Sequence, residues 1–197
     1  MRELGLHILD IVENALAAGA TQVALDIVED IAADRLTIKV KDNGRGMDDE
    51  TIRRVYDPFY TTRTTRHVGL GIPLFAATAK RCAGRLSITS RPGQGATVTA
   101  VLQHSHIDRP PLGDMPGTLI CILMRDQDFD LTYTHRITGA APRDASVFTF
   151  DTAEIKRELG PVPLTHPAVR EWLLEFVTEG EQALQEAASQ WLDDYTG

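Results

Sequence analysis

The spacing of apolar residues predicts an ordered series of helices and strands in the first half of the chain. Between Leu4 and Ala17, apolar residues recur at the period of an amphipathic helix, and Gly19 then supplies a helix stop. Alternating apolar and polar positions predict strands at residues 22–28, 35–41, 86–90 and 96–102. Helical spacing predicts two further helices, at residues 49–55 and 70–83.

The pattern changes after Gln103. Residues 104–117 carry Pro110, Pro111 and Pro116, so we expect a linker or arm there. Residues 118–124 suit a helix slightly better than a strand, and residues 131–138 and 146–151 predict a second hairpin. Residues 167–191 predict a long helix. Its apolar residues are expected on one face: Val169, Trp172, Leu173, Phe176, Val177, Leu184 and Trp191.

Composition narrows the class of protein. The chain has 197 residues, of which 43% are hydrophobic and 24% charged, as in a soluble globular protein of one large domain or slightly more. Its formal net charge of -8 argues against a broad surface for nucleic acid or an anionic membrane. The longest apolar run, residues 119–124, is too short to span a bilayer, and no secretory signal opens the chain. We therefore expect a cytoplasmic protein with neither nucleic acid nor membrane as a partner.

Four short motifs carry candidate chemistry, and the first lies in the N-terminal helix. Asn14 stands in the middle of H-I-L-D-I-V-E-N-A-L-A-A-G-A-T, where asparagine is a poor helix former. It is either an exposed residue on a solvated face or a ligand for Mg²⁺, to which an amide oxygen is well suited. Asp10 lies one turn earlier on the same face, where a carboxylate can orient a water toward a phosphate.

The second motif is D-N-G-R-G-M, residues 42–47, directly after a predicted strand. It is either a plain turn or an adenine site. The carboxylate of Asp42 can accept a hydrogen bond from the amino group of adenine and cannot donate one to guanine. Gly44 and Gly46 allow the backbone to approach a base closely, and Met47 ends the motif.

The third and fourth motifs indicate phosphate contacts. In D-P-F-Y-T-T-R-T-T-R-H-V-G-L-G-I, residues 57–72, a hydroxyl-rich basic loop precedes a helix, as expected of a lid over phosphates. Its candidate ligands are Arg63, Arg66, Gly69, Leu70 and Gly71. The fourth motif, G-Q-G-A-T at residues 93–97, is either a hairpin turn or a further nucleotide contact that includes Thr97.

Together these motifs resemble the ATP-binding domain shared by gyrase, chaperones, histidine kinases and MutL, over roughly residues 1–103. V-E-N-A-L-A-A-G-A-T is similar to the MutL form of the metal-binding helix, and D-P-F-Y-T-T-R and G-L-G-I-P-L resemble histidine kinase forms of the lid. The resemblance implies a Bergerat-type α/β two-layer sandwich, with a mixed, mostly antiparallel sheet and helices on one face. It also implies ATP and Mg²⁺ as cofactors, with Asn14 on the metal and Asp42 on adenine.

The departures from the family pattern are specific. Asp10 stands where hydrolysing members usually carry the longer Glu as general base. His67 replaces the first glycine of the lid box, and Ala96 replaces the usual threonine of the last box. The phosphoacceptor hairpin of sensor kinases is not expected, since residue 4 already begins the metal-binding helix, where His7 is expected to be structural. The chain therefore most resembles stand-alone histidine kinase-like ATPases, a likeness that H-I-D-R-P-P-L-G-D-M-P extends past the last strand.

Three functions remain open at this stage. The chain is an ATPase or ATP-gated regulator of a partner protein, a kinase that phosphorylates a separate protein on His or Ser, or a non-catalytic nucleotide sensor. Residues 104–197 are expected to form a smaller α+β extension that serves as an interaction module, and His104 and His106 are expected to be ordinary polar residues. The partner is either an unidentified protein or a second copy of the chain, because members of the superfamily often work as dimers.

Overall fold

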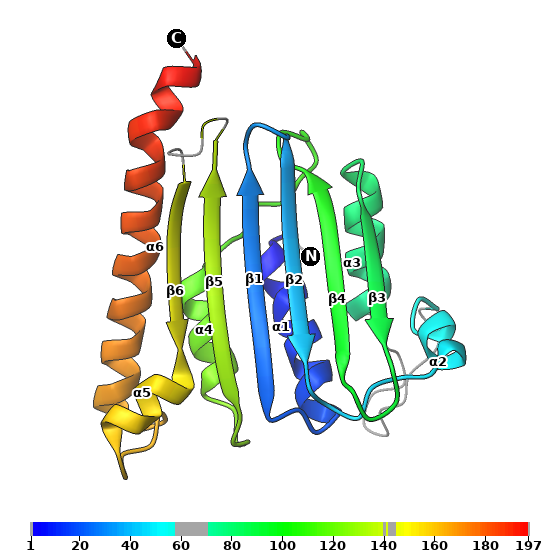
Figure 1. Cartoon of the computed structure of the whole chain (residues 1–197), viewed down its shortest axis with the longest axis vertical. Helices are drawn as coiled ribbons and strands as arrows, with labels where there is room; N and C mark the ends of the chain where they lie inside the picture. The colour runs from blue at the N-terminus through cyan, green and yellow to red at the C-terminus, as the bar shows by residue number, and fades with distance from the viewer. Residues whose placement is uncertain (1, 58–70, 140, 142–144, 197) are drawn as a thin grey trace.

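The computed structural model describes residues 2–57, 71–139, 141 and 145–196, with side chains up to residue 190 (Figure 1). The helices are α1 (Leu4–Ala17), α2 (Asp49–Arg54), α3 (Gly71–Arg81), α4 (Met115–Leu123), α5 (Thr152–Leu159) and α6 (Pro167–Thr196). The strands are β1 (Gln22–Asp30), β2 (Arg35–Asp42), β3 (Arg85–Ser90), β4 (Ala96–Gln103), β5 (Asp130–Thr138) and β6 (Ala145–Asp151). No helix in the described ranges is long and apolar enough to cross a membrane.

The six strands form a single mixed sheet with the order β3-β4-β2-β1-β5-β6. Every neighbouring pair is antiparallel except β1 and β5, which run parallel with Gln22 opposite Asp130. The predicted mixed, mostly antiparallel sheet is thus confirmed, as is the predicted second hairpin, β5–β6. The two strands of that hairpin extend the same sheet as the first four strands.

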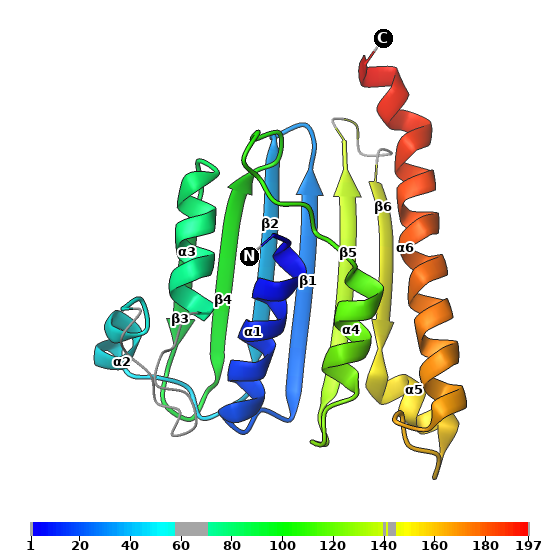
Figure 2. The same ribbon diagram turned by 180° about the vertical axis from the view of Figure 1, so that it is seen from behind.

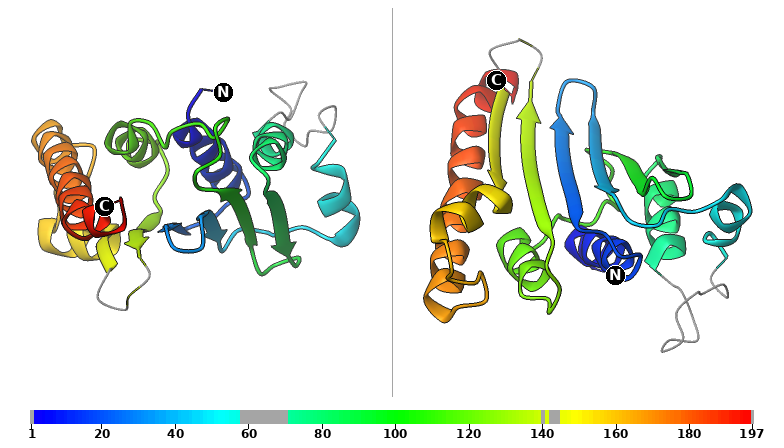
Figure 3. Two further views of the ribbon diagram at one scale, coloured as in Figure 1. Left: turned by 90° about the horizontal axis from the view of Figure 1, so that it is seen from above. Right: turned by 60° about the horizontal axis from the view of Figure 1, so that its bottom comes forward.

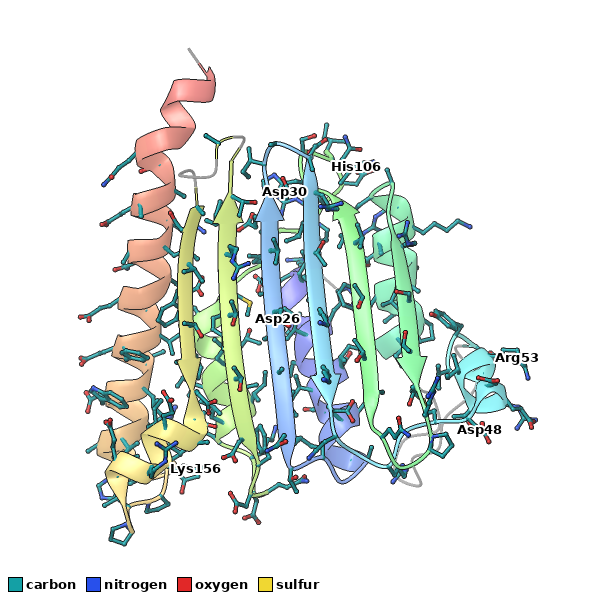
Figure 4. All side chains as sticks on the ribbon, in the orientation of Figure 1. Asp26, Asp30, Asp48, Arg53, His106 and Lys156 are labelled. Atoms are coloured by element: carbon teal, nitrogen blue, oxygen red, sulfur yellow. The ribbon has the colours of Figure 1, made fainter. Side chains whose placement is uncertain are left out.

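Four helices, α1, α3, α4 and α6, cover one face of the sheet, as Figures 2 and 3 show. The alternation of residues along β1 explains this arrangement. Leu25 and Ile27 are fully buried beneath the helices, whereas Asp26 between them is only half-buried and points to the opposite face (Figure 4). Because successive side chains of a strand point to opposite faces, one apolar face per strand produces a two-layer sandwich.

The proline-rich segment after β4 is packed against the start of α1. The backbone N–H groups of Leu4 and Gly5 donate to the carbonyl oxygens of Pro111 and Leu112, both over 2.9 Å. The first N–H groups of a helix have no partner within the helix, so this segment satisfies two of them. Of the two arrangements expected from sequence, an arm describes this segment better than a loose linker.

Helix α6 packs on β6, β5 and α4 through buried apolar residues. These residues are Val169, Leu173, Val177, Leu184 and Ala188. Trp172, expected on the same face, is instead 45% exposed and stacks on Phe176. The side chain of Trp191 lies outside the described residues. The division of the chain at residue 103 stays a prediction, although the continuous sheet favours one cooperative unit.

A buried network of charged residues joins the two halves of the chain. His135 of β5 is fully buried between two carboxylates: its Nε2 lies 3.0 Å from Oε1 of Glu29 in β1, and its Nδ1 lies 2.8 Å from Oε2 of Glu181 in α6. The hydroxyl of Tyr133 donates to Glu181 over 2.7 Å, and Nε2 of His104 lies 2.6 Å from Glu29. Each buried carboxylate therefore has at least two partners, which offsets its lost hydration.

This network shifts the pKa values of its members. Burial would lower the pKa of His135, but its hydrogen bonds with Glu181 and Glu29 raise it to about 9. Burial would raise the pKa of Glu29, but hydrogen bonds with His104 and His135 hold it at about 2. His7 of α1 behaves in the opposite way, because burial lowers its pKa to about 4.

We expect the thermal stability of the protein to peak near pH 6.5. The stabilisation from His135 is complete below its ordinary pKa of 6.5 and is lost as the pH rises through about 9. His7 destabilises the fold as the pH falls from 6.5 toward 4, because the unfolded chain takes up that proton first. Melting curves between pH 4 and pH 9 test this. A His135→Gln variant with an unchanged fall in melting temperature above pH 6.5 would contradict the assignment.

Candidate nucleotide-binding site

Asp42 stands at the end of β2, where the strand turns toward residues 43–47. Its Oδ1 accepts hydrogen bonds from the backbone N–H of Gly44 over 2.8 Å and of Ala96 over 3.3 Å. The side chain of Asp42 is half-buried. Among the described residues both of these bonds use Oδ1, so Oδ2 remains available to a ligand.

The turns at residues 42–47 and 91–95 pack directly on each other. Gly46 has a φ of +67° and Gly95 a φ of +76°, which favour glycine. A Cβ atom at Gly46 would overlap the carbonyl oxygen of Arg91, and one at Gly95 would overlap the carbonyl oxygen of Asp42. The backbone N–H of Met47 donates to the hydroxyl of Ser90 over 2.8 Å. Two of the predicted glycine motifs therefore form one rigid unit.

Two residues that sequence reasoning missed hold this unit against the rest of the fold. Oδ1 of Asn43 accepts from the backbone N–H groups of Thr21 and Gln22, both over 2.9 Å. The N–H of Arg45 donates to the carbonyl oxygen of Ala18 over 3.0 Å, at the end of α1. The only hint in the sequence was the Asn-Gly pair typical of turns, which does not reveal partners so far away in the chain.

Helix α1 places Asp10 and Asn14 one turn apart on a half-buried face. Asp10 lies against Gly71, the first residue of α3: a Cβ atom at Gly71 would be 3.0 Å from Cβ of Asp10. The start of α3 is thus beside the candidate base, as an N-terminal phosphate site requires. Glu13, in contrast, forms an ion pair with Arg125, which follows α4.

His7, His104 and His106 each contact other residues of the fold. His7 is fully buried and stacks on Phe75 with ring centroids 4.7 Å apart, and its Nε2 lies 3.3 Å from the hydroxyl of Thr78. This burial agrees with the structural role expected for it. His104 pairs with Glu29, and Nδ1 of His106 accepts from the N–H of Asp108 over 3.1 Å. Within the described ranges, no three His, Cys, Asp or Glu side chains could hold a metal together.

In the last glycine motif, residues 93–97, the backbone of Ala96 contacts the site, whereas Thr97 belongs to the other face of the sheet. Ala96 reaches Asp42 through its N–H, and the alternation of β4 buries Val98, Ala100 and Leu102 on the helix-covered face with Ala96. Thr97 pairs with Lys41 and belongs to the opposite, uncovered face. The strand geometry thus favours Ala96 over the predicted Thr97 as a contributor to this site.

The remaining candidate ligands of the lid lie outside the described residues. They are Arg63, Arg66, Gly69 and Leu70, together with His67. The described candidates fall into two contacting groups: Asp10 with Gly71, and Asp42 with the turn that carries Gly44, Gly46 and Met47. Helix α1 links the two groups, because Asn14 shares the face of Asp10 and Ala18 at the end of the helix accepts from the N–H of Arg45.

Comparison with known proteins agrees with this arrangement. Residues 2–106 match the family model of histidine kinase-, DNA gyrase B- and HSP90-like ATPases, which is more than half of the chain. The sensor protein kinase FleS of Pseudomonas aeruginosa is 41% identical over 95 residues, which cover 48% of this chain and 23% of FleS. Sporulation kinase C of Bacillus subtilis is 32% identical over 94 residues, which cover 48% of this chain and 22% of that kinase.

The chain therefore belongs to the family of histidine kinase-, DNA gyrase B- and HSP90-like ATPases. A putative sensor protein of Shewanella frigidimarina is 31% identical over 102 residues, which cover 51% of this chain and 16% of that protein. The chain thus matches less than a quarter of each of these three relatives, and the matched part of each corresponds to about half of this chain.

Proposed function

We propose that the chain binds ATP with Mg²⁺ and acts as an ATPase or ATP-gated regulator on a partner protein. The observation that carries this proposal is that α1 contacts both other elements: its Asp10 lies against Gly71 at the start of α3, and Ala18 at its end accepts from the turn that follows Asp42. A carboxylate for adenine, a helix N-terminus for phosphate and a half-buried acid beside it are the groups that ATP chemistry requires.

The oxygen donor of Asn14 suits Mg²⁺ better than a metal that is coordinated by protein side chains alone. Mg²⁺ keeps several waters and is usually bound by one or two side chains together with substrate phosphates. Asn14 supplies one hard oxygen donor on the same helical face as Asp10. Bound there, the ion would neutralise phosphate charge, while Asn14 and the N-terminus of α3 orient the phosphates and Asp10 holds a water.

Asp42→Asn is expected to weaken ATP binding by about 10- to 100-fold, the value of a hydrogen bond to a charged group. The amide oxygen can still accept from Gly44 and Ala96, so the turn should keep its shape. The new NH₂ group would then face the amino group of adenine, donor against donor. Titration calorimetry with ATP measures the loss.

The matched control is Asp26→Asn, which makes the same chemical change on the uncovered face of the sheet (Figure 4). It should bind ATP as the unmodified protein does. A folded Asp42→Asn variant with unchanged ATP affinity would disprove the adenine assignment.

A second function, phosphorylation of a separate protein on His or Ser, is supported by the names of two relatives, which are kinases. Incubation with ATP labelled at the γ-phosphate, with and without cell extract, separates the functions. Release of labelled phosphate supports an ATPase, and a labelled partner supports a kinase. If ATP binds and neither appears, the chain is a non-catalytic nucleotide sensor and the catalytic proposal fails.

A further inference from the structure

Residues 125–127, between α4 and β5, bind the C-terminal half of α1 through side-chain contacts. Arg125 forms an ion pair with Glu13, through Nη2 of the guanidinium and Oε1 of the carboxylate. Nε2 of Gln127 donates to the carbonyl oxygen of Leu16 over 3.2 Å and approaches that of Ala20 at 3.4 Å. The carbonyl oxygen of Leu16 also accepts from the backbone N–H of Gly19, so Gln127 adds a second donor at the end of α1.

The same end of α1 is also held by residues 42–47, which we call the adenine turn after the contact proposed for Asp42. The backbone N–H of Arg45 donates to the carbonyl oxygen of Ala18, and Nη1 of Arg45 donates to the carbonyl oxygen of Ala17 over 3.2 Å. The last turn of α1 is therefore fixed from two sides, by residues 42–47 and by residues 125–127. Asn14 lies in the stretch between these anchors and Asp10, so its position depends on both.

The segment that carries Arg125 is fastened at its far side to the C-terminal region. Nζ of Lys156 in α5 lies 2.9 Å from Oδ1 of both Asp128 and Asp130, and 2.7 Å from the carbonyl oxygen of Phe129 (Figure 4 labels Lys156). A continuous chain of contacts therefore runs from α5 through residues 125–130 to α1.

We propose that Arg125 and Gln127 are positioning residues for the magnesium–ATP site, which they hold in place through α1. This inference rests on the proposed ATP-binding function. Arg125 restrains Glu13, the residue directly before Asn14, and so limits the rotation of that turn of α1. The residues after 103 thereby contribute to metal-dependent nucleotide affinity without touching the nucleotide, and a partner that displaces residues 125–130 would change that affinity.

Arg125→Ala should weaken binding of ATP about tenfold in the presence of Mg²⁺, the lower end of what is lost when a group that orients a metal ligand is removed. Without Mg²⁺ the affinity for ATP should not change, because Asn43 anchors the adenine turn to Thr21 and Gln22, which lie outside α1. Arg125→Lys, which keeps the charge, should recover part of the loss. Isothermal calorimetry with and without Mg²⁺ measures both affinities.

The matched control is Arg35→Ala. It removes an ion pair with Asp30 whose side chains are 54% and 25% exposed, close to the 44% and 23% of Arg125 and Glu13. Figure 4 labels Asp30 at the end of β1 remote from Asp48, which follows the adenine turn. Arg35→Ala should bind ATP normally with and without Mg²⁺.

Glu13→Gln breaks the same ion pair from the side of α1 and serves if Arg125→Ala fails to fold. Its loss should match that of Arg125→Ala, and the double variant should lose no more than either single variant. Equal losses with and without Mg²⁺, or unchanged affinity in both variants, would overturn the inference. Failure of the unmodified protein to bind ATP would instead overturn the proposed function on which the inference rests.

Discussion

Replacing Asp10 by Asn should lower ATP turnover by about 100-fold or more, within the range that a positioned general base contributes. The amide cannot accept the proton of the attacking water. The change is nearly isosteric, so the contact between residue 10 and Gly71 at the start of α3 should survive and ATP affinity should fall little. Steady-state release of phosphate and calorimetric binding, measured on the same preparation, test the two halves of this expectation.

Glu13→Gln is the informative comparison for Asp10→Asn, because it also replaces a carboxylate by an amide, three residues further along α1. The ion pair between Glu13 and Arg125 directs that carboxylate toward α4, whereas Asp10 lies against α3. At saturating ATP, Glu13→Gln should therefore keep most of the turnover. If Glu13→Gln abolished turnover and Asp10→Asn did not, the base would be Glu13.

His135→Leu should reduce the free energy of unfolding by about 3 kcal/mol, as expected when one partner of a buried ion pair is removed. The exposed fraction of the side chain is 11% for Glu29 and 13% for Glu181, so water cannot replace the lost imidazolium fully. Glu29 retains His104, which leaves Glu181 with the larger loss. Urea unfolding near pH 6.5 measures the change.

Arg136→Leu provides the control on the same strand. Arg136 is exposed on the uncovered face, and its replacement should change the free energy of unfolding by less than about 0.5 kcal/mol. Adding Glu181→Gln to His135→Leu should recover part of the stability, because the amide removes the unpaired charge and can still accept from Tyr133. A single His135→Leu variant as stable as the unmodified protein would show that the network contributes nothing.

Elements with strong local periodicity could be predicted from the sequence. The N-terminal helix has the predicted bounds, and the strands from β1 to β4 begin within one residue of the predicted positions. The turn at residues 42–47 was predictable too, because Gly44 and Gly46 follow a strand and an acid. Helix α5 was missed because its eight residues form a window too short for the spacing of Ile155 and Leu159 to be distinguished from chance.

Pairings between distant residues were not predictable. The alternation of β5 indicates which face is buried but not which strand lies beside it, so its parallel pairing with β1 had no local signature. The contacts of His135 with Glu29 and Glu181, and of Arg125 with Glu13, join residues far apart in the chain. Thr97 lies on the uncovered face of β4, and its predicted contact with the nucleotide stays a prediction.

The central position of β1 has a consequence for how the protein folds. One neighbour, β2, is joined to it by a tight turn, whereas the other, β5, begins at Asp130. During synthesis the open edge of β1 must wait for most of the chain, and such long-range pairing is slow to form. Until then β1 keeps an unpaired edge, which favours aggregation. Substitutions in residues 130–138 should therefore lower the yield of folded protein in cells, although these residues do not belong to the nucleotide site.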